Sequence, residues 1–394
     1  MKRVLFVANA VQFGGLEIVL LDWLSGINYS KVSVTLCCRG DVLPEKLALT
    51  RLPVETIRLT IPDGQFFWNT LARWRRLFSS FRNDDIIFLE GGLGDLGVIP
   101  IFAARSSTQG KVSLFAGGGG PQPSVNPSAG QRNLHYGFLP GIGLHRLKEI
   151  LKQKARGTLL HRTFVSSQGF KDSLAAYSRY PIHRTSILYH GVNIARFKAS
   201  IPERPQFRRA LGVPEDATVI LSHGRLAPIK RVDRILKAFA VLSLEFPNLW
   251  LLLTSYGPLK GEIEQMVASS DTLGRVKLLE FQEDTSTLLK ASDIYVLASD
   301  REGFGIALVE AMSTSLVCVA TNCLGPADII KNQTNGFLVE ATDDGVLAGL
   351  RRAIDLTPED RARLVANARQ TVELRFEIDA AIRGALDAME IPSR

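Results

Sequence analysis

Short apolar runs alternate with amphipathic stretches along almost the whole chain, a pattern typical of parallel sheets covered by helices on both faces. In the first half, this pattern predicts strands at residues 3–8, 32–38, 54–59, 85–90, 111–116, 163–167 and 185–190, and helices at 16–24 and 68–81. The second half predicts strands at residues 219–223, 249–255, 276–281, 294–298, 317–321 and 336–339. The expected fold class is therefore α/β, with two doubly wound, Rossmann-like domains that face a cleft.

A polar, proline-bearing stretch at residues 199–205 separates the two halves. A chain of 394 residues is long for one core, which also favours two domains. We expect the first domain to span residues 1–198 and the second to span 199–371. Residues 372–394 follow, and the pattern from about 372 to 389 predicts one long terminal helix that packs back on the first domain.

The composition is that of a folded globular protein, with 46% hydrophobic and 22% charged residues. The longest apolar runs, such as residues 249–253, are far shorter than the roughly 18 residues that cross a bilayer. Lys2 and Arg3 resemble the start of a signal peptide, but the apolar stretch after them is too short for one. The four cysteines show no metal-binding spacing, so a reducing cytoplasm is the predicted location.

Positive charge is concentrated in the first half of the chain. Residues 1–200 hold 25 Lys and Arg against 12 Asp and Glu, or +13, and the remainder holds 22 against 27, or −5, which together give +8. Such asymmetry indicates that the first half faces an anionic surface or substrate. Because no helix-turn-helix, zinc-finger or RNA-binding motif is present, nucleic acid is not an expected partner.

The most informative motif is the segment 302–310, in which Glu302 and Glu310 flank a glycine-rich turn into a helix. It follows the predicted strand at 294–298, and ligands of open α/β sheets bind at the carboxyl ends of strands. A helix start attracts a phosphate, whereas carboxylates accept hydrogen bonds from hydroxyls. A diphosphate with hydroxyls at both ends describes a nucleotide sugar.

Two further segments follow predicted strands. Gly14 and Gly15 lie between the first strand and the first helix, where glycines allow close approach of a phosphate; a plain tight turn is the alternative. Arg225 and Lys230 follow the strand at 219–223, and two fixed cations there could neutralise a leaving diphosphate. The alternative is a solvated basic helix start, although cations there oppose the helix dipole.

Taken together, these motifs resemble a family 4 glycosyltransferase of the GT-B fold, one of the glycosyl transferases group 1. The resemblance is carried by Gly14-Gly15, by Gly224-Arg225 with Lys230, and by residues 302–312. Residues 189–197 and 335–339 also match the family's pattern, and the likeness is loose only over about 60–160.

The resemblance implies a retaining transfer of a sugar from a nucleotide donor, such as a UDP- or GDP-sugar, without a metal or another cofactor. In this family the first domain binds the acceptor and the second binds the nucleotide sugar. Carried over by position, the catalytic residues would be Glu302 on the donor sugar, with Arg225 and Lys230 on the diphosphate. The residues expected to bind the rest of the donor are Gly14, Gly15, Phe304, Gly305 and Ile306, with Glu310 on the ribose.

Some positions depart from the family. A histidine is common after the fifth strand of the first domain, but this chain has four glycines there, Gly117 to Gly120. They could let the backbone approach a substrate, form a mobile lid or have no function, and nothing indicates that His135 or His145 substitutes. Ser315 and Val317 replace a usual glycine and proline, and Glu280 replaces a glycine near the expected nucleotide base.

An arginine-rich helix at residues 67–78 offers a second site in the first half. Its apolar residues Leu71, Trp74, Leu77 and Phe78 share one face. Such a helix can lie on an anionic membrane surface, or it can pack that face on the sheet. The sequence leaves both alternatives open.

The leading hypothesis is a retaining glycosyltransferase that acts on a lipid-linked or polysaccharide precursor at the cytoplasmic membrane face, with peripheral attachment to the inner face of the plasma membrane. A second hypothesis is a nucleotide-sugar epimerase or a phosphorylase on the same fold. A third is a protein that binds nucleotide sugars without turnover, motivated by the missing histidine. The sequence does not indicate the donor, the acceptor or the oligomeric state.

Overall fold

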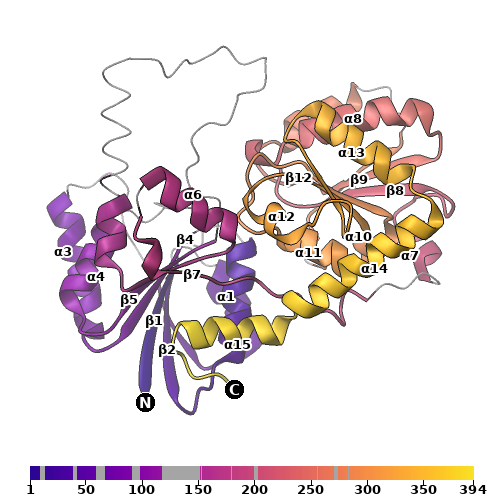
Figure 1. Ribbon diagram of the computed structural model, residues 1–394. Coiled ribbons are helices and arrows are strands. Elements are labelled where there is room, and N and C mark those ends of the chain that lie inside the picture. The colour runs from indigo at the N-terminus through magenta and orange to yellow at the C-terminus, as the bar shows by residue number, and fades with distance from the viewer. Residues whose placement is uncertain are drawn as a thin grey trace, which may run out of the picture. The chain divides into compact units, whose positions relative to one another are not determined.

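A computed structural model describes residues 1–8, 14–38, 42–58, 67–90, 98–117, 151, 153–178, 180–198, 203–254, 256–269, 274–282 and 284–394 (Figure 1). Contacts between residues divide the chain into two compact units. The first comprises Met1–His190 and Asp379–Arg394, and the second comprises Gly191–Ile378. The second unit thus begins ahead of the boundary expected after residue 198 and extends beyond the end expected at residue 371.

The first unit holds a parallel sheet of seven strands in the order β3-β2-β1-β4-β5-β6-β7. All seven strands predicted in this half are confirmed, with ends that differ by up to three residues. The strands are β1 (Lys2–Ala8), β2 (Val32–Cys38), β3 (Val54–Arg58), β4 (Asp85–Glu90), β5 (Val112–Ala116), β6 (Arg162–Val165) and β7 (Thr185–Ile187). Its helical elements are α1 (Gly15–Gly26), α2 (Val42–Thr50), α3 (Phe67–Phe78), η1 (Ser79–Phe81), α4 (Ile99–Ser107), α6 (Gln168–Ser178), η2 (Ile182–Arg184) and α15 (Ile378–Ala388).

Helices α3 and α4 cover one face of this sheet (Figure 1). Leu71, Trp74 and Phe78 of α3 are at most 4% exposed and pack into the core formed by the alternate residues of the strands. On the opposite face, Trp23 of α1 meets the ring of Phe115 edge-on at 4.8 Å. The packing alternative for the arginine-rich helix is therefore confirmed, and its buried apolar face is not available to a membrane.

The end of the chain corrects one prediction, because residues 372–389 do not form a single helix. Helix α14 (Pro358–Arg375) ends before Phe376, and α15 begins at Ile378. The Phe376 ring is fully buried and lies edge-on to Phe304 at 5.3 Å, and the Phe376 carbonyl accepts a hydrogen bond from the Val192 N–H at 2.8 Å. These contacts hold the chain in a non-helical conformation at this residue.

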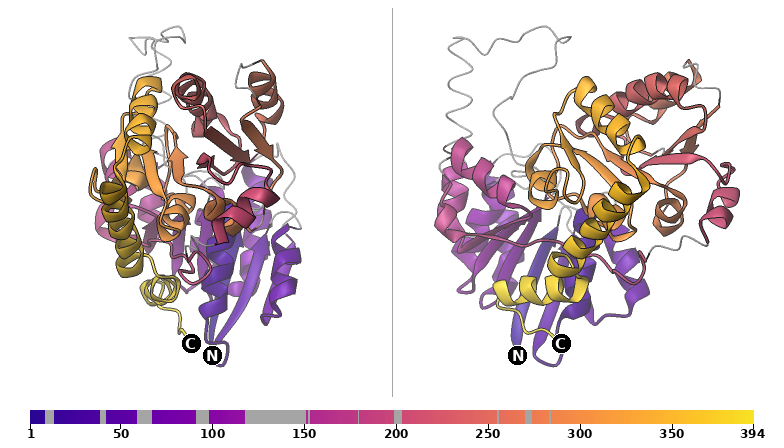
Figure 2. Two further views of the ribbon diagram at one scale, coloured as in Figure 1. Left: turned by 90° about the vertical axis from the view of Figure 1, so that its right-hand side faces the viewer. Right: turned by 45° about the vertical axis from the view of Figure 1, so that its right-hand side comes forward.

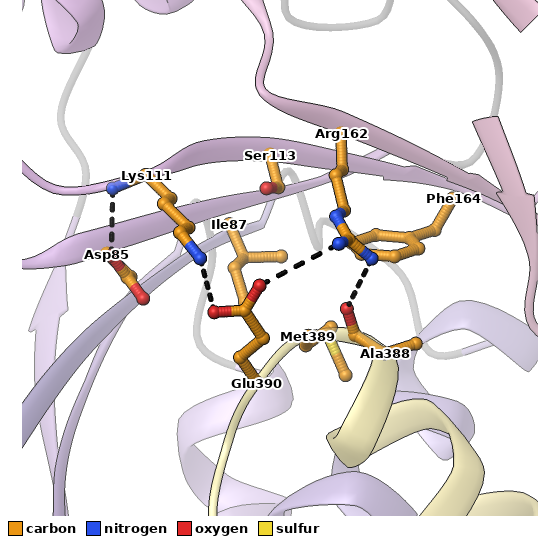
Figure 3. Close-up of a pocket in the computed structure, with 9 residues that line it drawn as sticks. All are labelled: Asp85, Ile87, Lys111, Ser113, Arg162, Phe164, Ala388, Met389 and Glu390. Atoms are coloured by element: carbon orange, nitrogen blue, oxygen red, sulfur yellow. Dashed lines mark hydrogen bonds and ion pairs between the residues drawn. The ribbon is translucent and has the colours of Figure 1, made fainter. Parts of the chain in front are cut away.

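The residues after α15 run along the first sheet and are held there by hydrogen bonds and charge. The Asn28 N–H donates to the Pro392 carbonyl at 2.9 Å. The Glu390 carboxylate lies between the side chains of Lys111 and Arg162 (Figure 3), where it pairs with Lys111 and lies 3.8 Å from Arg162 Nη2. These contacts make the C-terminal segment part of the first unit.

The second unit holds a parallel sheet of six strands in the order β10-β9-β8-β11-β12-β13. All six strands predicted for the second half are confirmed, with ends within two residues. They are β8 (Thr218–Ser222), β9 (Leu249–Thr254), β10 (Val276–Leu279), β11 (Ile294–Leu297), β12 (Val317–Thr321) and β13 (Phe337–Val339). With α14, the helical elements are α7 (Arg204–Ala210), η4 (Pro228–Lys230), α8 (Val232–Glu245), α9 (Lys260–Ala268), α10 (Ser286–Ala291), α11 (Ile306–Ser313), α12 (Leu324–Ile329) and α13 (Asp343–Ile354).

Helices cover both faces of the second sheet (Figures 1 and 2). Helices α8 and α13 pack on the face to which Ile220, Val296 and Val319 contribute. Helices α10 and α11 lie on the other face, and α14 packs beside α11 while its Leu364 joins the core of α8 and α13. None of the helices in the described ranges is long and apolar enough to cross a bilayer.

Candidate functional site

The predicted site of the second unit lies where the order of the strands reverses. Strands β10, β9 and β8 lie on one side of this point, and β11, β12 and β13 lie on the other. The segment 223–230 follows β8 and the segment 298–305 follows β11, so both leave the carboxyl end of the sheet side by side. This is the position at which open α/β sheets bind their ligands.

Lys230 and Glu302 join the two segments. The Lys230 ammonium forms an ion pair with Glu302 Oε2, and the two side chains are 29% and 17% exposed. Next to this pair, the Asp300 N–H donates to the Ile229 carbonyl at 2.9 Å. The predicted sugar-binding carboxylate and one predicted phosphate-binding cation are thus brought together, and both remain open to a ligand.

A second set of charges holds the start of α8. Arg231 has a left-handed backbone with φ of +49°, and its guanidinium contacts Asp233 at 2.8 Å and Asp300 at 3.4 Å. The buried Arg234 contacts the other Asp300 oxygen at 2.6 Å. Hydrogen bonding to Asp233 is the main cause of the raised pKa of Arg231. Arg231 and Arg234 at this helix start therefore have carboxylate partners, as Lys230 does.

Arg225 follows a glycine whose backbone few other residues could adopt. Gly224 has φ of +140°, and its N–H donates to Thr254 Oγ1 at 2.9 Å. Arg225 itself is exposed. Burial raises the pKa of the Tyr256 hydroxyl, and the charges of Lys230 and Arg225 oppose this shift. Both predicted phosphate-binding cations therefore lie within electrostatic reach of Tyr256, a residue that the sequence analysis did not single out.

The turn into α11 is rigidly built. Gly305 precedes the helix with φ of +106° and ψ of 59°, a conformation that favours glycine. Phe304 as a whole is 2% exposed, so its side chain is part of the core and not open to a ligand. A Cβ on Gly325 would come within 2.2 Å of the Phe304 carbonyl oxygen, and the Gly325 N–H donates to the Glu302 carbonyl at 2.9 Å. The close approach of α12 therefore fixes the turn that places Ile306 at the start of α11.

Glu310 lies one turn into the same helix, with 17% of its side chain exposed. Its Oε2 is 3.5 Å from Thr285 Oγ1 and 3.8 Å from His223 Nε2. Burial, and after it the charge of Lys230, lowers the pKa of His223 to about 4, so this imidazole is neutral near pH 7. Sequence reasoning missed His223 as a site residue, although its place at the end of a predicted strand and directly before Gly224 was a usable signal.

Gly14 and Gly15 belong to the first unit, at the start of α1. Gly14 has φ of −162° and ψ of −165°, an extended conformation open to any residue. A Cβ added there would lie 3.4 Å from Glu17 Oε2, an ordinary contact. Local geometry therefore gives no reason for glycine at this position, and a role in approaching phosphate stays a prediction.

The glycine run of the first unit is described only at its first residue. The Gly117 N–H donates to the Glu90 carbonyl at 3.0 Å, and its carbonyl accepts from Ser166 Oγ at 3.1 Å. Gly118 to Gly120, His135 and His145 lie outside the described residues. Within the described ranges, no three His, Cys, Asp or Glu side chains gather closely enough to hold a metal ion.

The part of the chain that holds the candidate site matches a known family model. Residues 203–371 match the model of the family described as glycosyl transferases group 1. The chain is 26% identical over 275 residues to an N-acetyl-alpha-D-glucosaminyl L-malate synthase of Bacillus anthracis, a match that covers 64% of this chain and 71% of that protein. It is 30% identical over 176 residues to a UDP-Gal:alpha-D-GlcNAc-diphosphoundecaprenol alpha-1,3-galactosyltransferase of Escherichia coli. That match covers 44% of this chain and 46% of that enzyme, so less than half of its length is spanned.

Solved structures share the whole fold. The Anabaena protein HepE, solved in complex with UDP and glucose, superposes with a TM-score of 0.78 at 19% sequence identity. The superposition covers 99% of this chain and all of HepE. At this level of identity the likeness shows the fold alone.

Proposed function

We propose that this chain, which has the GT-B fold and whose residues 203–371 match the model of the glycosyl transferases group 1, is a retaining, metal-independent glycosyltransferase. It takes a sugar from a nucleotide-sugar donor and passes it to a lipid-linked or polysaccharide precursor. The observation that carries this proposal is the grouping of Lys230, Glu302, Glu310 and the start of α11 at the point where the second sheet reverses its strand order.

The chemistry follows from where negative charge develops. When the bond between the anomeric carbon and the diphosphate breaks, its electron pair goes to the phosphate oxygen. Lys230, Arg225 and the first amides of α11 would stabilise this charge. The acceptor hydroxyl forms the new bond to the anomeric carbon, and its proton passes to an oxygen of the departing diphosphate. Glu302 would accept hydrogen bonds from the sugar hydroxyls and Glu310 from the ribose hydroxyls, at the two ends of the donor.

UDP is the first probe to test, because the HepE structure is described with UDP bound. In a thermal-shift screen, UDP, GDP, ADP and their sugars are compared at equal concentrations. A ligand at 100 times its dissociation constant stabilises the protein by roughly 2.7 kcal/mol. The proposal predicts that one nucleotide class raises the melting temperature clearly more than the others. No shift with any of them would contradict it.

Transfer itself is tested with the nucleotide sugar that the screen selects and a panel of lipid-linked and glycan acceptors. The proposal predicts a product that requires acceptor and whose anomeric configuration matches that of the donor. A product formed without any acceptor would indicate an epimerase, and a requirement for free phosphate would indicate a phosphorylase. Tight binding without transfer or hydrolysis over long incubation would indicate a binding protein.

A basic face of the first unit supports peripheral attachment to the cytoplasmic face of a membrane. Its members are exposed residues of α3, α4 and the adjoining turn, namely Arg73, Arg75, Arg76, Arg82 and Arg105, and we call this set the arginine face. Residues 67–83 and 98–117 contain no Asp or Glu. Phe102, 41% exposed, lies beneath the Arg75 guanidinium at 5.8 Å. Arginine binds phosphate through paired N–H groups, which suits lipid headgroups.

Vesicle sedimentation tests this attachment. Each basic residue near an anionic surface contributes about 1 kcal/mol, so replacing Arg73, Arg76 and Arg105 by Gln should weaken binding to phosphatidylglycerol vesicles on the order of 100-fold. The matched control removes three exposed arginines of the second unit, Arg209, Arg352 and Arg363. Equal losses in the two triple variants would contradict a role for the arginine face, as would equal binding to neutral phosphatidylcholine vesicles.

A further inference from the structure

His223 lies behind the nucleotide end of the proposed donor site. It is the first residue after β8, and its side chain is 7% exposed, against 17% for the Glu310 side chain in front of it. Its Nε2 atom is 3.8 Å from Glu310 Oε2, longer than a hydrogen bond. That Nε2 atom is buried and has no hydrogen-bond partner among the described residues. A buried polar atom of this kind is costly and calls for an explanation.

Two described neighbours of His223 support its ring or disfavour its protonation. Tyr295 of β11 is fully buried, and its ring is 5.5 Å from the imidazole. Lys230 of η4 faces it with a positive charge, which together with the larger effect of burial disfavours an imidazolium. Glu310 of α11 is the carboxylate within reach. A neutral imidazole that carries its proton on Nε2 can donate one hydrogen bond in that direction.

Two of the contacts at the Glu310 Oε2 atom are long. Thr285 Oγ1 is 3.5 Å away, at the outer limit of a hydrogen bond, and His223 Nε2 is farther still. Hydrogen bonds at functional sites are often long without ligand and tighten when it binds. A shift of about 1 Å would bring Nε2 and Oε2 to ordinary hydrogen-bonding distance.

We propose that His223 is a positioning residue for the nucleotide end of the donor site, whose Nε2–H donates to Glu310 once ligand is bound. This inference rests on the proposed function and deepens it. A carboxylate offers about four lone-pair directions, so one bond from His223 fixes its orientation and leaves the others for two ligand hydroxyls. A cation at residue 223 would instead form an ion pair with Glu310 and compete with those hydroxyls.

Three variants separate positioning from packing. His223→Leu keeps the volume and removes the donor. His223→Gln keeps an N–H donor on a side chain of similar length. Tyr295→Phe keeps the ring that supports the imidazole and removes only the Tyr295 hydroxyl, which is buried without a partner among the described residues.

The measurement is calorimetric titration of UDP into the full chain, with GDP and ADP as parallel probes, followed by kcat and KM for the matching nucleotide sugar. A hydrogen bond to a charged group corresponds to roughly 10- to 100-fold in affinity, so His223→Leu should raise Kd and KM by this factor with kcat changed less than about threefold. His223→Gln should recover most of the loss. Tyr295→Phe should bind like the wild type and be at least as stable.

Each contrary result has a distinct meaning. Wild-type affinity in His223→Leu would overturn the inference, as would a loss in His223→Gln as large as in His223→Leu. A loss of affinity in Tyr295→Phe equal to that in His223→Leu would show that the effect is not specific to the His223 donor, and would overturn the inference. The Lys230→Ala variant in the same titration tests the proposed function, which predicts that it binds nucleotide more weakly than the wild type. If Lys230→Ala is weakened while His223→Leu is unimpaired, only the positioning role fails. If no nucleotide binds the wild type, both fail together.

Discussion

The two units each place an ion pair at the carboxyl edge of their sheet, and the two pairs differ in exposure. In the first unit, Glu90 ends β4 and contacts Arg156 at 2.5 Å, with both side chains 0% exposed. In the second unit, Lys230 and Glu302 follow β8 and β11 and are 29% and 17% exposed. Removing one partner of a buried pair leaves an uncompensated charge in the interior, so the fold depends on both partners. A partly exposed pair is able to exchange partners with a ligand. From this difference in exposure we propose a structural role for the Glu90–Arg156 pair and a ligand-binding role for the Lys230–Glu302 pair.

The largest expected effect comes from breaking the buried pair. Glu90→Ala should lower the free energy of unfolding by about 3 to 5 kcal/mol, because it leaves the Arg156 charge buried. The Arg156 Nε and Nη1 atoms already have no partner among the described residues. Denaturant unfolding measures the loss, and the double variant Glu90→Leu with Arg156→Met is the control. A structural role of this pair would be contradicted if Glu90→Ala were as stable as the wild type. It would also be contradicted if the double variant were less stable than Glu90→Ala.

Breaking the partly exposed pair of Lys230 and Glu302 should affect activity more than stability. Lys230→Ala is expected to lower the rate of sugar transfer on the order of 100-fold or more, because it removes a cation from the leaving diphosphate. Its effect on unfolding should stay within about 1 kcal/mol, because the pair is partly solvated. Lys237 is the matched control, since it pairs with Asp343 at 2.8 Å in the same unit but on the helix α8 surface. Full activity in Lys230→Ala, or an equal loss of activity in Lys237→Ala, would contradict a role of the Lys230–Glu302 pair in sugar transfer.

A smaller effect is expected at the turn beside Glu302. Gly305→Ala places a side chain on a backbone with φ of +106°, which should destabilise by about 1 to 3 kcal/mol. The added Cβ would meet Glu302 Cγ and Leu308 Cβ at 3.5 Å, so backbone strain and not a clash is the cause. Gly261→Ala in helix α9 is the control and should be neutral or stabilising, because no atom lies within 4 Å of its Cβ and its backbone is helical. Similar results at the two glycines would argue against strain at Gly305.

The smallest effect is expected where the C-terminal segment is tied to the first sheet. Lys111 is the main cause that lowers the pKa of Glu390 below its ordinary value of 4.5. The stabilisation is therefore present above about pH 4.5 and is lost as the pH falls and the carboxylate is protonated. Since Glu390 is 46% exposed, Glu390→Gln should lower stability at pH 7 by about half a kcal/mol or less, and by less than that at pH 3. A difference in stability between wild type and Glu390→Gln that grows as the pH falls would contradict this role of Glu390.

The strands and the position of the site could be predicted from sequence because both depend on local pattern. Runs such as residues 317–321 are apolar and β-branched, and a parallel sheet puts whatever follows its strands at one edge. Contacts between distant residues could not be predicted in this way. The pairing of Lys230 with Glu302 spans 72 positions, and the break before α15 depends on Phe376 packing against Phe304.

The positions of buried polar side chains near the candidate site also could not be predicted from the sequence. Tyr295 lies in the run 294–297, where its ring fits the apolar pattern of a buried strand and its hydroxyl gives no sign of a functional neighbour. His223 was likewise counted as the end of a strand. Only the approach of α11, which brings Glu310 to 3.8 Å, shows that these two side chains lie behind the predicted site.

The central claim is that the edge between β8 and β11 binds the diphosphate of a nucleotide sugar. Titration of UDP into wild type, Lys230→Ala and Lys237→Ala tests it most directly, with GDP and ADP measured in parallel. The account predicts that one nucleotide binds the wild type and Lys237→Ala alike and binds Lys230→Ala at least about tenfold more weakly, as expected for a lost charge-assisted hydrogen bond. Equal affinity for all three proteins would contradict it.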